Sequence, residues 1–340
     1  MSDYKIQEAL TYQDVLLVPQ YSDIKTRKEV DISADLQPGM TLPIPIIASP
    51  MDTVSERAMA DSLAQIGAMA VIHRYNSPEL QSSHVNDCFG LVGGAIGMSG
   101  DYRDRADMLV SAGAQVLCVD VAHGHHVSMK DALRWLSDNY KSEGVHIIAG
   151  NVATLDGFNA LADWGADSVR CNIGGGSICT TRVQTGHGVP GLHTIFDCAN
   201  SVNAGYVNII ADGGIRNSGD IVKALAAGAD VVMLGSLLAG TAEAPGSVIW
   251  EDGKAYKEYR GMASRKAQVD WRGKVGTPEG VTSRVPHRGS VRDVVLELAG
   301  GIRSGLSYSG ARDITQLQAK AKFIRQTGAG QIESSDHINK

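Results

Sequence analysis

The sequence predicts a (β/α)8 barrel, and three features of the chain lead to this fold class. Eight short runs rich in β-branched residues recur at intervals of roughly 25 to 40 residues, and an amphipathic stretch follows each run. The runs are continuously apolar, as strands buried on both faces must be. Glycine and polar residues gather where the runs end, which is typical of the loops at one face of a parallel barrel.

The predicted elements follow one another in the order that this fold requires. Residues 1–40 are an N-terminal lead-in. The eight strands are expected at 45–49, 69–73, 92–97, 116–121, 146–151, 168–173, 208–213 and 231–236. Helices are expected between them, for example at 103–112, 129–139 and 219–227, each closing near a glycine. No linker interrupts the pattern, so residues 1–340 are expected to be a single domain.

The pattern changes after the eighth strand. Residues 251–288, here named the flap, are polar and glycine-rich with little apolar periodicity. Helical periodicity resumes from Val291 onward, so we expect the flap to be a mobile lid over the barrel. The tail, residues 326–340, is expected to be coil.

Composition excludes several classes of partner. The 31 basic and 37 acidic residues give a formal net charge of −6, which argues against binding to nucleic acid or to an anionic membrane. No apolar run approaches the roughly 18 residues of a membrane span, and the N-terminus does not resemble a signal peptide. Five cysteines without a CxxC pair fit neither a disulfide framework nor a zinc site. A soluble, cytoplasmic protein is therefore expected.

The expected active site lies at the carboxyl ends of the strands, where barrel enzymes carry their functional groups. The residues at these ends include Ser49, Met51, Asp120, Asn151, Asp212, Gly213, Gly214, Gly235 and Ser236. Two glycine-rich turns follow the seventh and eighth strands. We expect these turns to bind a phosphate group through backbone N–H groups.

The loop 174–181, Gly-Gly-Gly-Ser-Ile-Cys-Thr-Thr, is the most unusual segment of the chain. Its glycines let the backbone approach a ligand closely, and Ser177 can donate to a phosphate oxygen. Cys179 lies on this turn at the expected catalytic face, where a thiolate can attack an electrophilic ring carbon and form a covalent intermediate.

Four other residues could be catalytic or purely structural. Cys118 and Cys171 lie inside predicted strands and are expected to be buried and inert. Thr181 is close enough to Cys179 in sequence to polarise or deprotonate a neighbour. Glu279, in the flap, is either a solvated charge or a general acid or base.

Five motifs occur in one order along the predicted barrel. They are ASPMDTVSE at 48–56, GGGSICTT at 174–181, ADGGIRNSGD at 211–220, MLGSLLAG at 233–240 and EYRGMAS at 258–264. From Leu10 to nearly the C-terminus the chain resembles the inosine monophosphate dehydrogenase and guanosine monophosphate reductase family. The resemblance implies an oxidoreductase that binds a purine nucleoside monophosphate, uses a nicotinamide cofactor and assembles as a homotetramer.

The resemblance also implies roles for individual residues. Cys179 would be the nucleophile at purine C2, with Thr181 and Glu279 as its activating pair. The nucleotide pocket would consist of Ser49, Met51, Ser177, Asp212, Gly213, Gly214, Gly235, Ser236, Tyr259, Gly261 and Met262. The nicotinamide half of the cofactor would face Asp120, Asn151, Arg170 and Gly174. A potassium ion would bind the carbonyls of Gly174, Gly176 and Cys179, together with Glu333 in the tail of a neighbouring subunit.

Two reactions are consistent with this resemblance, and three features favour a GMP reductase that uses NADPH. Residues 179–182 with 185–186 resemble the reductase more than the dehydrogenase. Only residues 76–91 separate the second and third strands, where most dehydrogenases carry an inserted regulatory module. The flap reads Asp270-Trp271-Arg272-Gly273 and lacks the tyrosine that follows the arginine in dehydrogenases.

Other features resemble bacterial IMP dehydrogenases, which oxidise IMP to XMP with NAD. These are residues 120–125, residues 284–286 and the tail. Asn172 departs from both branches, in which glycine is usual where the nicotinamide packs. A noncatalytic barrel that binds purine nucleotides is the third alternative.

Overall fold

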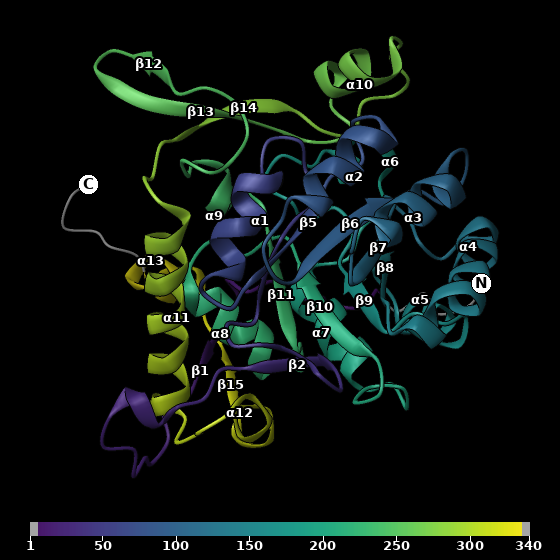
Figure 1. Ribbon diagram of the computed structural model, residues 1–340. Coiled ribbons are helices and arrows are strands. Elements are labelled where there is room, and N and C mark those ends of the chain that lie inside the picture. The colour runs from purple at the N-terminus through teal and green to yellow at the C-terminus, as the bar shows by residue number, and fades with distance from the viewer. Residues whose placement is uncertain (1–5, 335–340) are drawn as a thin grey trace.

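The computed structural model describes residues 6–334 of the 340-residue chain (Figure 1). Eight parallel strands form a closed barrel in the order β10, β11, β4, β5, β6, β7, β8, β9. Their bounds are Ile46–Ala48 (β4), Met69–Ile72 (β5), Val92–Ile96 (β6), Val116–Asp120 (β7), His146–Val152 (β8), Ser168–Cys171 (β9), Asn208–Asp212 (β10) and Val231–Leu234 (β11). Each strand overlaps one predicted run, so the predicted (β/α)8 barrel is confirmed.

Burial on both faces explains why these runs are strands. Every residue of β4, β5, β6, β9 and β11 is buried, as expected for a barrel wall covered by helices. Most predicted strands extend one or two residues past the observed ends. The polar or glycine residue at these positions, such as His73 after β5 or Gly97 after β6, leaves the ladder and begins a loop.

Helices, several of which begin at a capping side chain, surround the barrel. They are α1 (Arg57–Ala64), α2 (Pro78–Asn86), α3 (Tyr102–Ser111), α4 (Val127–Tyr140), α5 (Leu155–Asp163), α7 (Gly191–Ala199), α8 (Ser218–Ala226) and α11 (Val291–Tyr308). Side chains of Ser77, Thr154 and Asn217 accept hydrogen bonds from first-turn N–H groups of α2, α5 and α8. Two short helices, α6 (Thr181–Thr185) and α9 (Ser236–Ala239), follow β9 and β11 directly.

The lead-in covers the amino end of the barrel. Strands β2 (Ala34–Gln37) and β3 (Met40–Leu42) form a hairpin across that end (Figure 1). His146 Nδ1 lies 3.1 Å from Gln37 Oε1, and Asn208 Nδ2 donates to the carbonyl of Leu36 at 2.8 Å. The lead-in also contains β1 (Val15–Leu17) and the short helix η1 (Arg27–Glu29).

The flap contains more regular structure than its composition predicts. Strands β12 (Ile249–Glu251), β13 (Lys254–Arg260) and β14 (Thr282–Pro286) form an antiparallel sheet, and helix α10 (Arg265–Arg272) lies between the last two. This sheet lies over the end of the barrel opposite to the β2–β3 hairpin (Figure 1). Only alternate residues of β13, such as Lys257 and Tyr259, are buried, so its strands show little continuous apolar character.

The expectation of a coil tail is wrong for the described residues. After helix α12 (Ile314–Lys320), strand β15 (Phe323–Arg325) pairs with β1, and helix α13 (Gly328–Glu333) follows. Thr327 caps this helix by accepting from the N–H of Gly330, an arrangement that the polar composition concealed. Residues 335–340 of the predicted tail lie outside the described residues. Within residues 6–334, no helix is long and apolar enough to cross a membrane.

The fold makes a prediction about the contact between the helices and the barrel. Phe158 of α5 is fully buried. We expect Phe158→Ala to lower the free energy of unfolding by about 3–5 kcal/mol, because truncation leaves a cavity and removes apolar contact. Denaturant titration would measure this change, with Phe89→Ala as the control because the Phe89 side chain is exposed. Equal midpoints for the two variants would contradict the packing.

Candidate active site

The loop after β9 brings the three predicted catalytic residues into one hydrogen-bonded chain. The Cys179 thiol donates to Thr181 Oγ1, with the two atoms 3.2 Å apart. The Thr181 hydroxyl in turn donates to Glu279 Oε2 at 2.8 Å. A proton can therefore pass from the sulfur to a carboxylate through one hydroxyl group, as nucleophile activation requires.

The flap supplies Glu279 by pairing with the catalytic loop. The N–H of Thr180 donates to the carbonyl of Glu279 at 3.0 Å, and the N–H of Val281 donates to the carbonyl of Ile178 at 3.0 Å. The N–H of Glu279 donates to the carbonyl of Ala263 within the flap. These backbone bonds fix Glu279 relative to Cys179 although their side chains come from segments far apart in sequence.

A second group of predicted residues meets at Gly235, after β11. A Cβ atom on Gly235 would lie 2.8 Å from the Tyr259 hydroxyl and 3.0 Å from Ser49 Oγ. Any other residue at this position would therefore displace these two atoms. The Tyr259 hydroxyl also contacts Met51 Sδ at 3.8 Å and hydrogen-bonds to Ser177. Burial raises the pKa of Tyr259 to about 12, so its hydroxyl stays a neutral donor.

The remaining residues predicted for the nucleotide pocket lie next to these two groups. Met262 Sδ accepts from the N–H of Asp52 at 3.4 Å, beside Met51. The N–H of Gly261 donates to the carbonyl of Val281, next to the flap bonds described above. Ser236 begins α9, and Gly213 and Gly214 follow β10.

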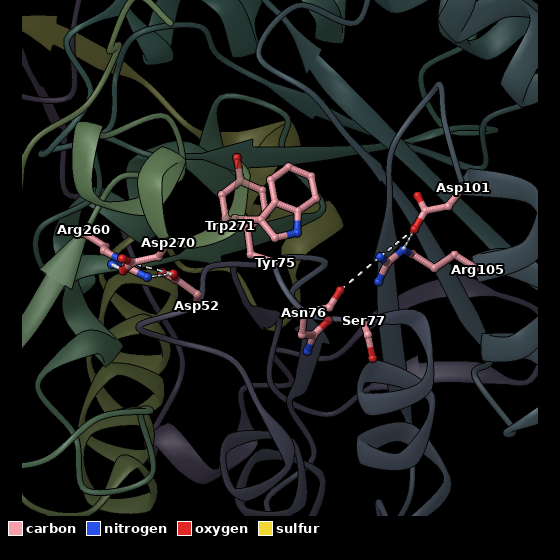
Figure 2. A pocket seen from close by; sticks show the side chains of 9 residues that line it. All are labelled: Asp52, Tyr75, Asn76, Ser77, Asp101, Arg105, Arg260, Asp270 and Trp271. Atoms are coloured by element: carbon pink, nitrogen blue, oxygen red, sulfur yellow. Dashed lines mark hydrogen bonds and ion pairs between the residues drawn. The ribbon is translucent and has the colours of Figure 1, made fainter. Parts of the chain in front are cut away.

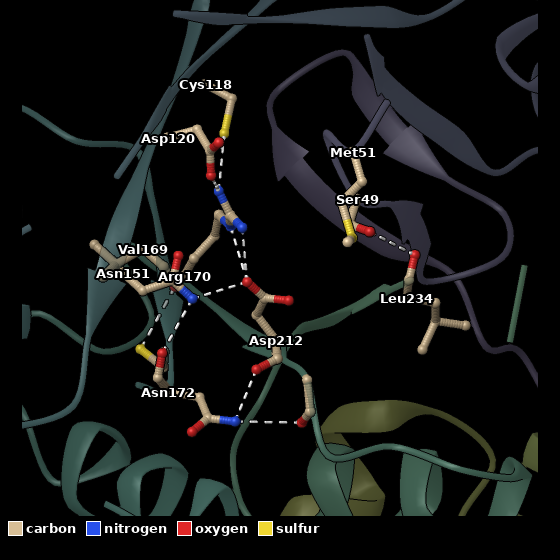
Figure 3. A network of polar contacts seen from close by, with 12 residues as sticks. Ser49, Met51, Cys118, Asp120, Asn151, Val169, Arg170, Asn172, Asp212 and Leu234 are labelled. Atoms are coloured by element: carbon tan, nitrogen blue, oxygen red, sulfur yellow. Dashed lines mark hydrogen bonds and ion pairs between the residues drawn. The ribbon is translucent and has the colours of Figure 1, made fainter. Parts of the chain in front are cut away.

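A buried cluster of charges joins strands β7, β9 and β10 (Figure 3). Arg170 forms ion pairs with Asp120 and Asp212, and its side chain is 8% exposed. Asp212 Oδ2 accepts from Arg170 Nε at 3.1 Å and Nη2 at 2.8 Å, and from Asn151 Nδ2 at 2.8 Å. Burial alone would lower the pKa of Arg170, but the two carboxylates raise it well above its ordinary value. Arg170 is therefore a permanent cation that holds both carboxylates in place.

Gly174, the fourth residue predicted for the cofactor, lies against the side chain of Arg182. A Cβ atom on Gly174 would lie 2.5 Å from Cγ of Arg182, so this glycine packs against α6. The carbonyl of Gly176 accepts from the N–H of Cys179, and Glu333 is exposed at the end of α13. The potassium site, which needs carbonyl groups and a second subunit, stays a prediction.

Sequence reasoning missed the contacts that hold the flap against the barrel. A pocket of about 410 Å³ lies under the flap and is lined by Asp52, Tyr75, Asn76, Ser77, Asp101, Arg105, Arg260, Asp270 and Trp271 (Figure 2). The rings of Tyr75 and Trp271 stack with their centroids 4.2 Å apart. Arg260 donates to Asp52 at 2.9 Å through Nε and also pairs with Asp270. A Tyr in the loop after β5 and a Trp in a polar flap were the available signals.

Comparisons with known proteins agree with this geometry. A family model described as the IMP dehydrogenase / GMP reductase domain matches residues 9–337. Inosine-5'-monophosphate dehydrogenase from Aquifex aeolicus is 36% identical, over 98% of this chain and 96% of the relative. GMP reductase from Leishmania major is 32% identical, over 98% of this chain and 97% of the relative.

A solved structure is similar over the same extent. It is a variant of GMP reductase from Trypanosoma brucei in complex with guanosine 5'-monophosphate, with a TM-score of 0.93, 32% identity and 98% coverage of both chains. Relatives with both names are thus about equally similar to this chain. The family match over nearly all residues shows that the chain belongs to the IMP dehydrogenase / GMP reductase family of oxidoreductases, which use nicotinamide cofactors.

Proposed function

We propose that this chain is a GMP reductase that converts GMP to IMP and ammonia with NADPH, through a covalent adduct between Cys179 and purine C2. The observation that carries the proposal is the hydrogen-bonded chain from Cys179 through Thr181 to Glu279. These hydrogen bonds let Glu279 take the thiol proton through Thr181 and return a proton to a leaving amino group. A proton donor is what the expulsion of ammonia requires.

The nucleotide would bind across the loops after β9, β10 and β11. Ser177, Tyr259 and the N–H groups around Gly235 offer neutral donors for the phosphate. The protein hydrogen bonds of the Asp212 carboxylate all reach Oδ2 within the described residues, which leaves Oδ1 to accept from a ribose hydroxyl (Figure 3). The GMP in the similar Trypanosoma brucei structure supports a purine nucleotide as the ligand.

In the first chemical step, the Cys179 proton passes through Thr181 to the Glu279 carboxylate. The sulfur forms a bond to purine C2, and the electron pair of the C2–N3 double bond moves to N3, which takes up a proton. Glu279, now protonated, donates through Thr181 to the 2-amino group. The C2–N bond then breaks, ammonia leaves, and loss of the N3 proton restores the C2–N3 double bond in the adduct.

The residues at the ends of β7, β8 and β9 fit a nicotinamide group. Within the described residues, no protein donor reaches Asn151 Oδ1 or Asp120 Oδ2, so both oxygens can accept from the carboxamide N–H groups. The ion pair with Arg170 holds the Asp120 carboxylate in place. A reduced nicotinamide, when bound, supplies the hydride that purine C2 needs after ammonia has left.

One argument from the sequence for the reductase loses its force. The short connection between β5 and β6 leaves no room for an inserted module, which by itself favours this branch. The Aquifex aeolicus dehydrogenase and the Leishmania major reductase align over 473 and 478 positions, more than the 340 residues of this chain. Relatives with either name thus carry extra residues, so chain length does not separate the two activities.

A specific contact favours IMP dehydrogenase as the second candidate. That reaction needs a base for water, and Tyr75 lies near Arg272 although no tyrosine follows Arg272 in sequence. However, burial raises the pKa of Tyr75 in spite of the nearby arginines, which leaves its hydroxyl protonated at neutral pH. Arg272 itself lies 5.0 Å from the ring of Trp271. The relay from Cys179 through Thr181 to Glu279 therefore stays the main support for ammonia expulsion.

The proposed direction predicts which substrate pair reacts. With GMP and NADPH, we expect loss of nicotinamide absorbance and release of one ammonia per turnover. With IMP and NAD, we expect slow oxidation or none, because no tyrosine follows Arg272 in the flap to form the pair that activates water. Absorbance at the nicotinamide band, with GMP plus NADH as a cofactor control, would measure both rates. Faster IMP oxidation than GMP reduction would assign the chain to the dehydrogenase, and no reaction with either pair would favour a nucleotide-binding barrel.

The proton relay makes a prediction about Glu279. Glu279→Gln removes the proton carrier with little change in size, so we expect the rate of GMP reduction to fall by roughly 10² to 10⁴. The KM for GMP should change much less. Arg272→Ala is the matched flap control and should keep most activity. Loss of IMP oxidation in Arg272→Ala and in Tyr75→Phe, with normal GMP reduction, would instead show that these residues activate water.

The site also predicts a difference among the thiols. Burial raises the pKa of Cys118 to about 12 and raises that of Cys171, whereas Cys179 is half-buried and contacts Thr181. A pKa above its ordinary value leaves less thiolate at pH 8, so Cys179 should be alkylated first. GMP should protect it. Peptide mass spectrometry after iodoacetamide treatment measures this order, and equal labelling of the three thiols would contradict an activated nucleophile.

A further inference from the structure

Asn172 follows β9 and has a backbone conformation that glycine ordinarily adopts. Its φ angle is 139°, in the half of the Ramachandran map that disfavours residues with a Cβ atom. The residue is only 3% exposed. Backbone strain of this kind persists only where surrounding contacts hold the residue in place. The contacts of its side chain therefore indicate what it does.

The Asn172 amide binds the backbone of the turn after β10. Its Nδ2 donates to the carbonyl of Asp212 at 2.8 Å and lies 3.4 Å from the carbonyl oxygen of Gly213 (Figure 3). Two carbonyl oxygens at this point require a donor, which sets the orientation of the amide. Oδ1 of Asn172 is buried and has no hydrogen-bond partner within residues 6–334. In the flipped amide, Oδ1 would face both carbonyl oxygens, so the amide keeps the donor orientation and leaves Oδ1 without a partner.

The same amide fills the space between two loops of the site. A Cβ atom on Gly175 would lie 2.1 Å from Asn172 Nδ2, so the glycine lets the loop before Cys179 close over the amide. A Cβ atom on Gly213 would lie 3.2 Å from the backbone N of Gly176. The cysteine loop and the turn 212–214 thus contact each other directly, and the Asn172 amide packs against both.

Peptide geometry connects these contacts to the nucleotide. In a planar trans peptide, the carbonyl of one residue and the N–H of the next point in opposite directions. When Asn172 holds the carbonyls of Asp212 and Gly213 on one side of the turn, the N–H groups of Gly213 and Gly214 face the other side. Both glycines have positive φ angles, 85° and 79°, so this turn has few side-chain constraints of its own.

We propose that Asn172 is a positioning residue for nucleotide binding: its amide orients the turn 212–214 so that the two N–H groups face the phosphate and the Asp212 carboxylate faces the ribose. The proposal rests on the proposed function, because it takes a purine nucleoside monophosphate as the ligand of this turn. It concerns affinity for that nucleotide and not the stability of the barrel.

Two variants separate these effects. Asn172→Gly relieves the backbone strain and removes the donor. We expect an unchanged or higher Tm but about tenfold weaker binding of GMP, the upper range for one neutral hydrogen bond. Asn172→Asp keeps the size but sets a carboxylate oxygen against two carbonyls, so it should also bind GMP more weakly. Isothermal titration calorimetry with GMP and no cofactor, together with thermal unfolding, measures both quantities.

Asn208→Ala is the matched control, because Asn208 also donates to a backbone carbonyl but lies at the opposite end of β10. It should lower Tm and leave GMP affinity unchanged. Wild-type affinity in Asn172→Gly, or an equal loss of affinity in Asn208→Ala, would overturn the proposal. Failure of the wild-type chain to bind GMP would overturn the proposed nucleotide site itself, which is a distinguishable result.

Discussion

Closure of the barrel is the constraint on which the rest of the structure depends. The pairing of β11 with β4, from Val232 opposite Ile46 to Leu234 opposite Ala48, joins the last strand to the first. Without it, Ser49 and Met51 would lie at one edge of an open sheet and Gly235 at the other. With it, these residues meet within contact distance of Tyr259. The parallel direction of all eight strands then sends their polar ends to one face.

The catalytic group adds a second constraint, because the barrel alone does not complete it. Cys179 and Thr181 belong to the loop after β9, whereas Glu279 belongs to the flap, 98 positions beyond Thr181. Backbone bonds at Thr180 and Val281 join the two segments. Any movement that separates the flap from the loop would therefore remove the carboxylate from the thiol. Side-chain contacts, such as the stacked rings of Tyr75 and Trp271, also hold the flap against the barrel.

Sequence reasoning located the strands and most candidate residues because both depend on local patterns. Continuous apolar runs predicted the eight strands, and glycine-rich turns predicted a phosphate site that stays a prediction. The flap sheet was missed because its strands bury alternate residues and are otherwise polar, and helix α13 was missed because a Thr cap stabilises a polar segment. The ion pairs of Arg170 with two carboxylates could not be predicted, since they join three strands. Asn172 was recognised as unusual, but its partners on β10 become visible only in three dimensions.

The site explains why family membership leaves the direction of the reaction open. A thiol, a proton carrier and a turn that binds phosphate are needed to form an adduct at purine C2, whichever reaction follows. The reactions diverge only afterwards, when a leaving amine needs a proton or a water molecule must lose one. A protonated Glu279 meets the first need. The second would fall to groups under the flap, where burial raises the pKa of Tyr75 and keeps its proton in place. The direction of the reaction therefore depends on which groups the flap brings to the adduct, and not on the barrel, which relatives with either name share.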